Sequence, residues 1–232
     1  MLEIIQKYGV MFLVGAWPHG PVGGLAATLI LAASGLVLAF PLAVLLGFAR
    51  ISDYKALRWF AAAWVVVLRG VPLIMLIFWA YFLVPLVTGM TVSVFTTALV
   101  AIVLYESAFL AEIVRAGLQG LPRGQTEAAR SVGLSYWQSM RYVILPQALV
   151  NMIPSLVNQF VSTVKATSIV YIIGMEELTF VANQVNSVEL TSALQTYMVL
   201  AGIYFLVCLT LSYAARMVEV HINRRRAGLV QG

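Results

Sequence analysis

Residues 121–146 have the sequence LPRGQTEAARSVGLSYWQSMRYVILP, which is far more polar than the chain on either side. The stretch contains the charged residues Arg123, Glu127, Arg130 and Arg141, together with alanines that favour helix. The flanking sequence is almost uniformly apolar. A polar helical segment between apolar stretches predicts a surface that contacts either water or another protein, and the rest of the chain bears on which.

The composition is that of an integral membrane protein. Of 232 residues, 62% are hydrophobic and only 10% are charged, whereas a soluble domain has about 25% charged residues. We therefore expect an all-α membrane protein with a single membrane domain. The only cysteine, Cys208, excludes an intrachain disulfide. The net charge of +5 does not indicate nucleic-acid binding, because the basic residues are distributed as membrane topology requires.

Uncharged stretches predict five membrane spans, since a span needs about 20 apolar residues. The predicted spans are residues 22–49, 59–84, 93–114, 142–164 and 190–215. Proline and glycine predict a turn at 85–91, and residues 169–189 are expected to form a short helix folded back at the outer face. The domain division is then an N-terminal segment, 1–21, a membrane domain, 22–216, with a polar loop at 115–146, and a basic tail, 217–232.

The N-terminal segment, 1–21, resembles a signal peptide only weakly, because Glu3 precedes Lys7 where a basic start would be expected. We interpret it as a retained amphipathic helix that lies at the membrane interface. A cleaved signal and a sixth span are the alternatives.

The basic residues predict the orientation in the membrane. Lys and Arg residues collect in cytoplasmic loops. Of the fourteen basic residues, Lys7 lies on one side of the predicted membrane and eleven lie on the other, namely Arg50, Lys55, Arg58, Arg115, Arg123, Arg130, Arg141, Arg216, Arg224, Arg225 and Arg226. The N-terminus is therefore expected outside and the C-terminus in the cytoplasm, which makes residues 121–146 cytoplasmic.

Capping signals divide this cytoplasmic stretch into two short helices. Thr126 is predicted to cap the first helix, with Glu127 in its first turn, and Gly133 is predicted to end it. Ser135 is predicted to cap the second helix, and Pro146 to close it. The alanines would let a partner approach the first helix closely. A docking helix and a solvated loop are both consistent with this pattern.

The stretch resembles the cytoplasmic EAA loop of ABC importer permeases, whose pattern is E-A-A, three residues, G, nine residues, I-x-L-P. The matching residues are Glu127, Ala128, Ala129, Gly133, Leu145 and Pro146, with Val143 in place of the usual Ile. Residues 64–82, 106–149 and 158–178 are similar to the polar amino acid subfamily, and the resemblance covers about 24–216. It implies that the first short helix docks on an ATP-binding subunit.

The resemblance implies a type I ABC importer permease fold in a bacterial inner membrane, and import of a polar amino acid that a binding protein delivers. The implied partners are two ATP-binding subunits and a second, identical or related permease chain. The chain has no G-x-x-x-x-G-K-[ST] phosphate loop, so ATP and magnesium are expected in the partner, with no cofactor, metal site or enzymatic activity here. An ion-coupled secondary amino acid transporter is the alternative, although such transporters usually show internal repeats.

Polar side chains within the spans are candidates for the substrate path. They are Asn158, Gln159, Ser162, Lys165, Thr167 and Ser168, together with Glu106 and Arg69. Such residues either join helices or line a wet cavity, and we favour the cavity. Arg69 is interpreted first as a member of a structural ion pair, and Glu106 as its partner or as a lining residue. Glu112 and Arg115, three residues apart, are expected to pair.

Gln159 bears on the choice of substrate. Family members that import cationic amino acids look to have an acidic residue at this position, next to Asn158. A carboxylate would be the natural partner of a substrate cation, and this chain has a neutral amide instead. We therefore expect an acidic or neutral polar amino acid, with glutamate and aspartate ahead of glutamine.

Overall fold

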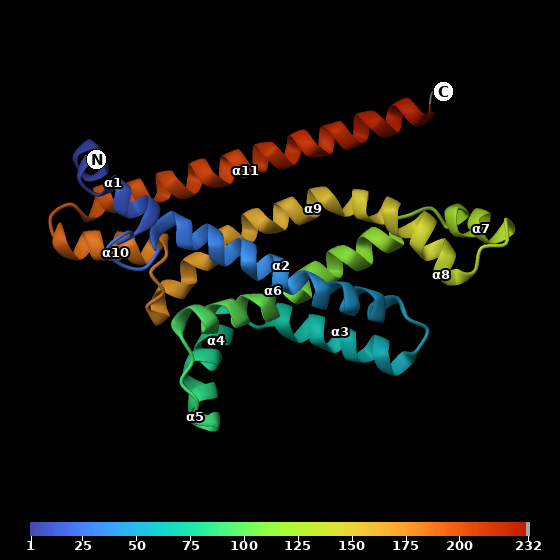
Figure 1. Cartoon of the computed structure of the whole chain (residues 1–232), viewed down its shortest axis with the longest axis horizontal. Coiled ribbons are helices and arrows are strands. Elements are labelled where there is room, and N and C mark those ends of the chain that lie inside the picture. The colour runs from blue at the N-terminus through green and yellow to red at the C-terminus, as the bar shows by residue number, and fades with distance from the viewer. Residues whose placement is uncertain (231–232) are drawn as a thin grey trace.

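The computed structural model describes residues 1–230, and the side chains of residues 1–222 (Figure 1). Its described secondary structure is helical. The elements are α1 (Leu2–Val14), α2 (Gly24–Ile51), α3 (Lys55–Gly70), α4 (Leu73–Phe78), the π turn η1 (Trp79–Leu83), α5 (Val84–Thr88), α6 (Val94–Gln119), α7 (Arg123–Ser131), α8 (Tyr136–Ser139), the π turn η2 (Met140–Ile144), α9 (Leu145–Ala166), the 3-10 helix η3 (Thr167–Ile173), α10 (Leu178–Val188) and α11 (Ala193–Val230).

Helices α2 and α6 form the centre of the molecule and pack against each other along their length. Two glycines of α2 make the close approach possible. A Cβ on Gly35 would lie 2.6 Å from Cγ2 of Ile102, and a Cβ on Gly47 would lie 2.5 Å from Cγ1 of Val114. Both pairs advance in the same direction along the two helices, so α2 and α6 run parallel. This is the direction that the first and third spans of an up-and-down chain must share.

Four of the five predicted spans are present as helices long and apolar enough, among the described residues, to cross a membrane. The second predicted span is the bent pair α3 and α4–α5, a shape that fits a broken span or a re-entrant loop. The prediction of a continuous helix over 59–84 is wrong, because the pair is bent by 99°. Pro72 explains the bend: a proline disfavours helix at the preceding residue, and Val71 is extended at φ −95° and ψ 131°.

Two prolines lie inside helices that they were predicted to interrupt. Pro85 was placed in a turn and Pro146 at the end of a helix, and both predictions are wrong. A proline lacks an N–H and clashes with the carbonyl four residues earlier, and a π turn widens the helix at that point. Such a turn, η1 or η2, precedes each proline. The chain turns only at Gly89, which has φ 70°, and the helix that starts at Tyr136 continues to Ile173.

Helices α1, α10 and the start of α11 pack together at one end of the molecule, and α7 and α8 lie at the opposite end (Figure 1). Phe12, Leu178 and Val199 are buried in the contact between the three helices. The N-terminal segment and residues 169–189 therefore contain the expected short helices. The location of α1 at a membrane interface stays a prediction.

Glu177 joins α10 to α2 and α11 from a completely buried position. Its carboxylate accepts hydrogen bonds from the backbone N–H groups of Thr179 and Phe180, both at 2.9 Å. It also accepts from the hydroxyls of Tyr204, at 3.1 Å, and Thr28, at 3.5 Å. Burial raises the pKa of Glu177 to about 7 in spite of these donors. A titratable group thus holds three helices together at this end of the fold.

Candidate functional site

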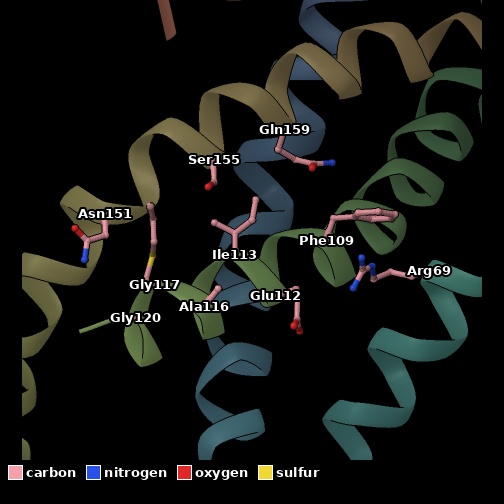
Figure 2. A pocket seen from close by; sticks show the side chains of 11 residues that line it. Arg69, Phe109, Glu112, Ile113, Ala116, Gly117, Gly120, Asn151, Ser155 and Gln159 are labelled. Carbon is pink, nitrogen blue, oxygen red and sulfur yellow. The ribbon is translucent and has the colours of Figure 1, made fainter. Parts of the chain in front are cut away.

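A cavity of about 520 Å³ lies between α6 and α9, next to the end of α3 (Figure 2). Side chains of α6 and α9 face each other across it, and Arg69 reaches it from α3. The lining residues are Arg69, Phe109, Glu112, Ile113, Ala116, Gly117, Gly120, Asn151, Met152, Ser155 and Gln159. The wall thus combines two charged groups with amide and hydroxyl groups, which suits a small polar ligand.

The two charged groups in the cavity wall differ in how they are neutralised. Glu112 pairs with Arg115, as predicted, and also with Arg50, whose Nη2 lies 3.4 Å from Oε2 of Glu112. Arg69 makes none of the ion pairs found among residues 1–222. Its guanidinium lies over the ring of Phe109, 5.1 Å from the centroid. The ion pair expected for Arg69 is therefore not formed among the described residues.

Glu106 lies behind the cavity wall and neither lines the cavity nor pairs with Arg69. Its side chain is buried, and Nε2 of Gln159 donates a hydrogen bond of 2.8 Å to its Oε2. Gln159 itself lines the cavity. Glu106, on α6, therefore orients the amide of Gln159, on α9. This contact differs from both expected roles, partner of Arg69 and cavity-lining residue.

The candidate polar residues of α9 and of η3, which follows it, have different surroundings. Thr167 is buried and donates to the carbonyl of Val164, and Ser168 donates to that of Lys165. A group of polar residues on α9 follows one line along the helix at alternating spacings of four and three residues, and we call it the α9 polar stripe: Asn151, Ser155, Asn158, Ser162 and Lys165. Asn151 and Ser155 line the cavity, and the last three continue from it, exposed on the surface of this chain.

Sequence analysis missed several residues of the cavity wall. Asn151 and Ser155 were detectable, because they extend the stripe of Asn158 and Ser162 by one heptad toward the N-terminus of α9. Phe109 and the apolar residues beside it carry no such signal, since they look like ordinary span residues.

Helix α7 begins earlier than predicted. Thr126 does not cap it, and Glu127 lies beyond its first turn, because the helix starts at Arg123 with Pro122 at the N-cap. A proline has no N–H to satisfy and a φ suited to a helix start, and Pro122 has φ −56°. Gly133, at φ 86°, lies just past the end of the helix, as predicted. Ser135 caps the next helix, and Gln138 completes a capping box.

The residues of the polar loop separate into a packed face and an exposed face. Ala129 is buried against the body of the protein, whereas Glu127 and Ala128 are exposed. Two apolar side chains nearby, Val132 and Trp137, are each 76% exposed. Of the remaining motif residues, Gly133 and Pro146 are exposed and Leu145 is half-buried. The loop therefore presents charged, small and apolar groups together on a surface away from the cavity, as a docking surface would.

Membrane-crossing helices around a polar cavity, with a separate exposed helical loop, define a subunit of a membrane transport system. The family model described as "binding-protein-dependent transport system inner membrane component" matches residues 39–220. The chain belongs to this family. Membership does not favour the alternative of an ion-coupled secondary transporter.

Curated relatives and a solved structure agree with this assignment. The chain is 38% identical to the inner membrane amino-acid ABC transporter permease protein YhdY of Escherichia coli K12, over 94% of this chain and 61% of that relative. It is 34% identical to the probable glutamine ABC transporter permease protein GlnP of Bacillus subtilis 168, over 94% of this chain and 99% of that relative. The crystal structure of an amino acid ABC transporter with histidines superposes with a TM-score of 0.82 at 32% identity, over 95% of this chain and 96% of that one. The predicted importer permease fold is confirmed.

Proposed function

We propose that this chain is the permease subunit of an ATP-driven importer, and that it forms the path of a polar amino acid across a bacterial inner membrane. The α9 polar stripe is the observation that supports this most directly. Amides, hydroxyls and an amine on the face of a membrane-crossing helix lose hydrogen bonds if they face lipid. If the stripe lined a water-filled path between this chain and a second permease chain, its polar groups would stay hydrated. The same path would lead the substrate into the cavity.

The charges of the cavity favour an acidic or neutral substrate. Arg69 is the cation in the wall that forms no ion pair with a carboxylate of the described residues, whereas Glu112 is engaged by two other arginines. Gln159 is neutral, and the carboxylate of Glu106 accepts a hydrogen bond from the amide of Gln159. A substrate carboxylate would therefore find a partner in Arg69, and a cationic side chain would find none. Glutamate and aspartate fit best, and glutamine, named for the Bacillus relative, comes next.

The exposed face of α7 supports docking of ATP-binding subunits. Glu127 and Ala128 point away from the protein, and Ala129 attaches the helix to it. Two such subunits would bind ATP and magnesium, and their closure would draw the α7 helices of two permease chains together. The cavity would then open outward to a loaded binding protein, and hydrolysis would return it inward. Differences in binding energy between these states drive the cycle.

ATPase stimulation of the assembled complex tests this function. Proteoliposomes with permease, ATP-binding subunits and binding protein should hydrolyse ATP faster when the binding protein carries glutamate, aspartate or glutamine than when it is empty. Uptake of glutamate should be inhibited by aspartate and not by arginine. Inhibition by arginine as strong as by glutamate would contradict the substrate class. Transport by this chain alone under a sodium or proton gradient would contradict the importer itself.

A further inference from the structure

One continuous helical rod connects the polar loop with the cavity. It runs from Tyr136 to Ile173 through α8, η2, α9 and η3 (Figure 1). Its first turns belong to the loop at the α7 end of the molecule, and its middle carries Asn151, Ser155 and Gln159 of the cavity wall. A displacement of the start of the rod therefore reaches the cavity without crossing any loop.

The rod has a weak point between these two regions. The π turn η2 covers Met140–Ile144, and the N–H of Leu145 bonds to the carbonyl of Met140. Pro146 follows and has no N–H, so the carbonyl of Tyr142 receives no α-helical hydrogen bond from it. Because a π turn is wider and less regular than an α turn, the rod can change direction here.

The side chain of Gln147 spans this weak point and helix α7. Its Nε2 donates to the backbone carbonyl of Val143, inside the π turn, at 2.9 Å. The same Nε2 donates to Oε1 of Gln125, on α7, at 3.2 Å. The side-chain amide of Gln147 thus donates both to the polar loop, at Gln125, and to the π turn of the rod, at Val143. Gln147 is half-buried and Gln125 is exposed, so the second bond lies at the edge of the contact.

A short turn, residues 132–135, joins helix α7 to the start of the rod, and the N–H groups of Gly133 and Leu134 in this turn bond to the carbonyls of Arg130 and Ala129. The packed face of α7 consists of small residues, of which Ala129 is the buried one. Within residues 1–222, the bond from Gln147 to Gln125 is the side-chain hydrogen bond that joins α7 to another helix. Small apolar contacts allow a helix to slide or rotate, whereas a hydrogen bond specifies one register. This amide therefore adds a specific side-chain contact to the turn that joins α7 to the rod.

We propose that Gln147 is a positioning residue that transmits the movement of α7 to the cavity helix at the π turn. This inference rests on the proposed function, since it assumes that ATP-binding subunits move α7. When α7 is drawn toward its counterpart, Gln125 pulls on Gln147, and the displacement enters the rod at the π turn. Without the amide, α7 would move with the ATP-binding subunits, and less of this displacement would reach the cavity part of the rod.

Three variants of the assembled, reconstituted complex test the role of Gln147. Gln147→Leu removes both hydrogen bonds, and Gln125→Leu removes only the one between α7 and the rod. Gln125→Glu is the matched control, because a carboxylate still accepts from the amide. The measurement is the number of ATP molecules hydrolysed per amino acid transported, at equal amounts of assembled complex. Both leucine variants should raise this ratio about threefold to tenfold, the factor that corresponds to one neutral hydrogen bond, and Gln125→Glu should not.

The double leucine variant separates transmission from a merely local role. If the two amides act as one joint, the double variant has the same ratio as Gln147→Leu alone. If Gln147 only satisfies the carbonyl of Val143, Gln125→Leu keeps the wild-type ratio, and that result overturns the inference. A proportional loss of transport and hydrolysis in both leucine variants also overturns it. Failure of the wild-type complex to transport would instead contradict the proposed function.

Discussion

At the scale of single residues, the cavity is distinguished by a guanidinium that packs on an aromatic ring instead of pairing with a carboxylate. Arg69 lies at the end of α3, just before the bend at Pro72. This position places its side chain in the wall of the cavity between α6 and α9. The ring of Phe109 supports the cation without neutralising it. A charge kept available in this way suits a ligand that arrives with a carboxylate.

Replacement of Arg69 should weaken transport of acidic amino acids. A hydrogen bond to a charged group contributes about 1.5–3 kcal/mol, so Arg69→Gln should raise the apparent KM for glutamate uptake by about tenfold or more. Arg69→Lys keeps the charge and should have a smaller effect. Arg58→Gln is the matched control, because Arg58 lies on the same helix and binds the carbonyl of Ser52, away from the cavity. An unchanged KM in Arg69→Gln would exclude this contact with the substrate.

Glu177 should make the stability of the protein depend on pH. Its pKa is raised to about 7 by burial, so the folded protein holds a proton between about pH 4.5 and 7 that the unfolded chain releases. The contribution of this group to stability is therefore fully present at low pH and is lost as the pH rises through 7. The free energy of unfolding therefore decreases with rising pH, by at most about 3 kcal/mol from this group.

The thermal unfolding midpoint of the detergent-solubilised protein measures this dependence. The midpoint should fall as the pH is raised from 5 to 8, and Glu177→Gln, which stays neutral, should flatten the curve. The ion pair of Lys7 with Glu189, at the same end, acts in a different pH range. The hydrogen bond from Lys7 lowers the pKa of Glu189, so the contribution of this pair to stability is lost only in more acidic solution. A wild-type midpoint that rises with pH over 5 to 8 would contradict the assignment.

At the scale of helices, sequence patterns correctly predicted two kinds of feature: long apolar spans, and turns or caps that one residue type favours. The spans of α2, α6 and α11 follow from apolar length, and the turn at Gly133 and the cap at Ser135 follow from local chemistry. The errors cluster at prolines. The chain bends by 99° at Pro72, whereas Pro85 and Pro146 lie inside continuous helices and each follows a π turn. Sequence alone does not distinguish these outcomes, since the packing around each proline decides between a bend and a widened turn.

The close contact of α2 and α6 predicts an order of stability among glycine variants. A Cβ on Gly47 would lie 2.5 Å and 2.8 Å from Cγ1 and Cβ of Val114, which is branched and cannot move aside. A Cβ on Gly117 would meet Cγ, Cε and Sδ of Met152, an unbranched side chain that borders the cavity. Gly70 has open space. Overpacking costs about 1–3 kcal/mol, so Gly47→Ala should lower the unfolding midpoint by several degrees, Gly117→Ala by less, and Gly70→Ala not at all. Equal midpoints for Gly47→Ala and Gly70→Ala would contradict the packing described.

At the scale of the whole molecule, the fold separates two kinds of surface. The polar loop with α7 and α8 lies at one end, and α1, α10 and the start of α11 lie at the other (Figure 1). The cavity and the α9 polar stripe occupy the length between them. This separation is what alternating access requires, because energy enters at one side of the membrane and substrate at the other. It also makes the orientation of the chain a direct test of the proposal.

Labelling of single cysteines should place the two ends on opposite sides of the membrane. Cys208 is the only native cysteine, so Cys208→Ala provides a background for one new cysteine at a time. His19→Cys lies in the exposed turn after α1, and Asp53→Cys in the exposed turn between α2 and α3, where basic residues surround it. Because Lys and Arg are retained on the cytoplasmic side, a membrane-impermeant maleimide should label His19→Cys in intact spheroplasts and Asp53→Cys only after permeabilisation. The reverse pattern would invert the chain and place α7 where no ATP-binding subunit reaches it.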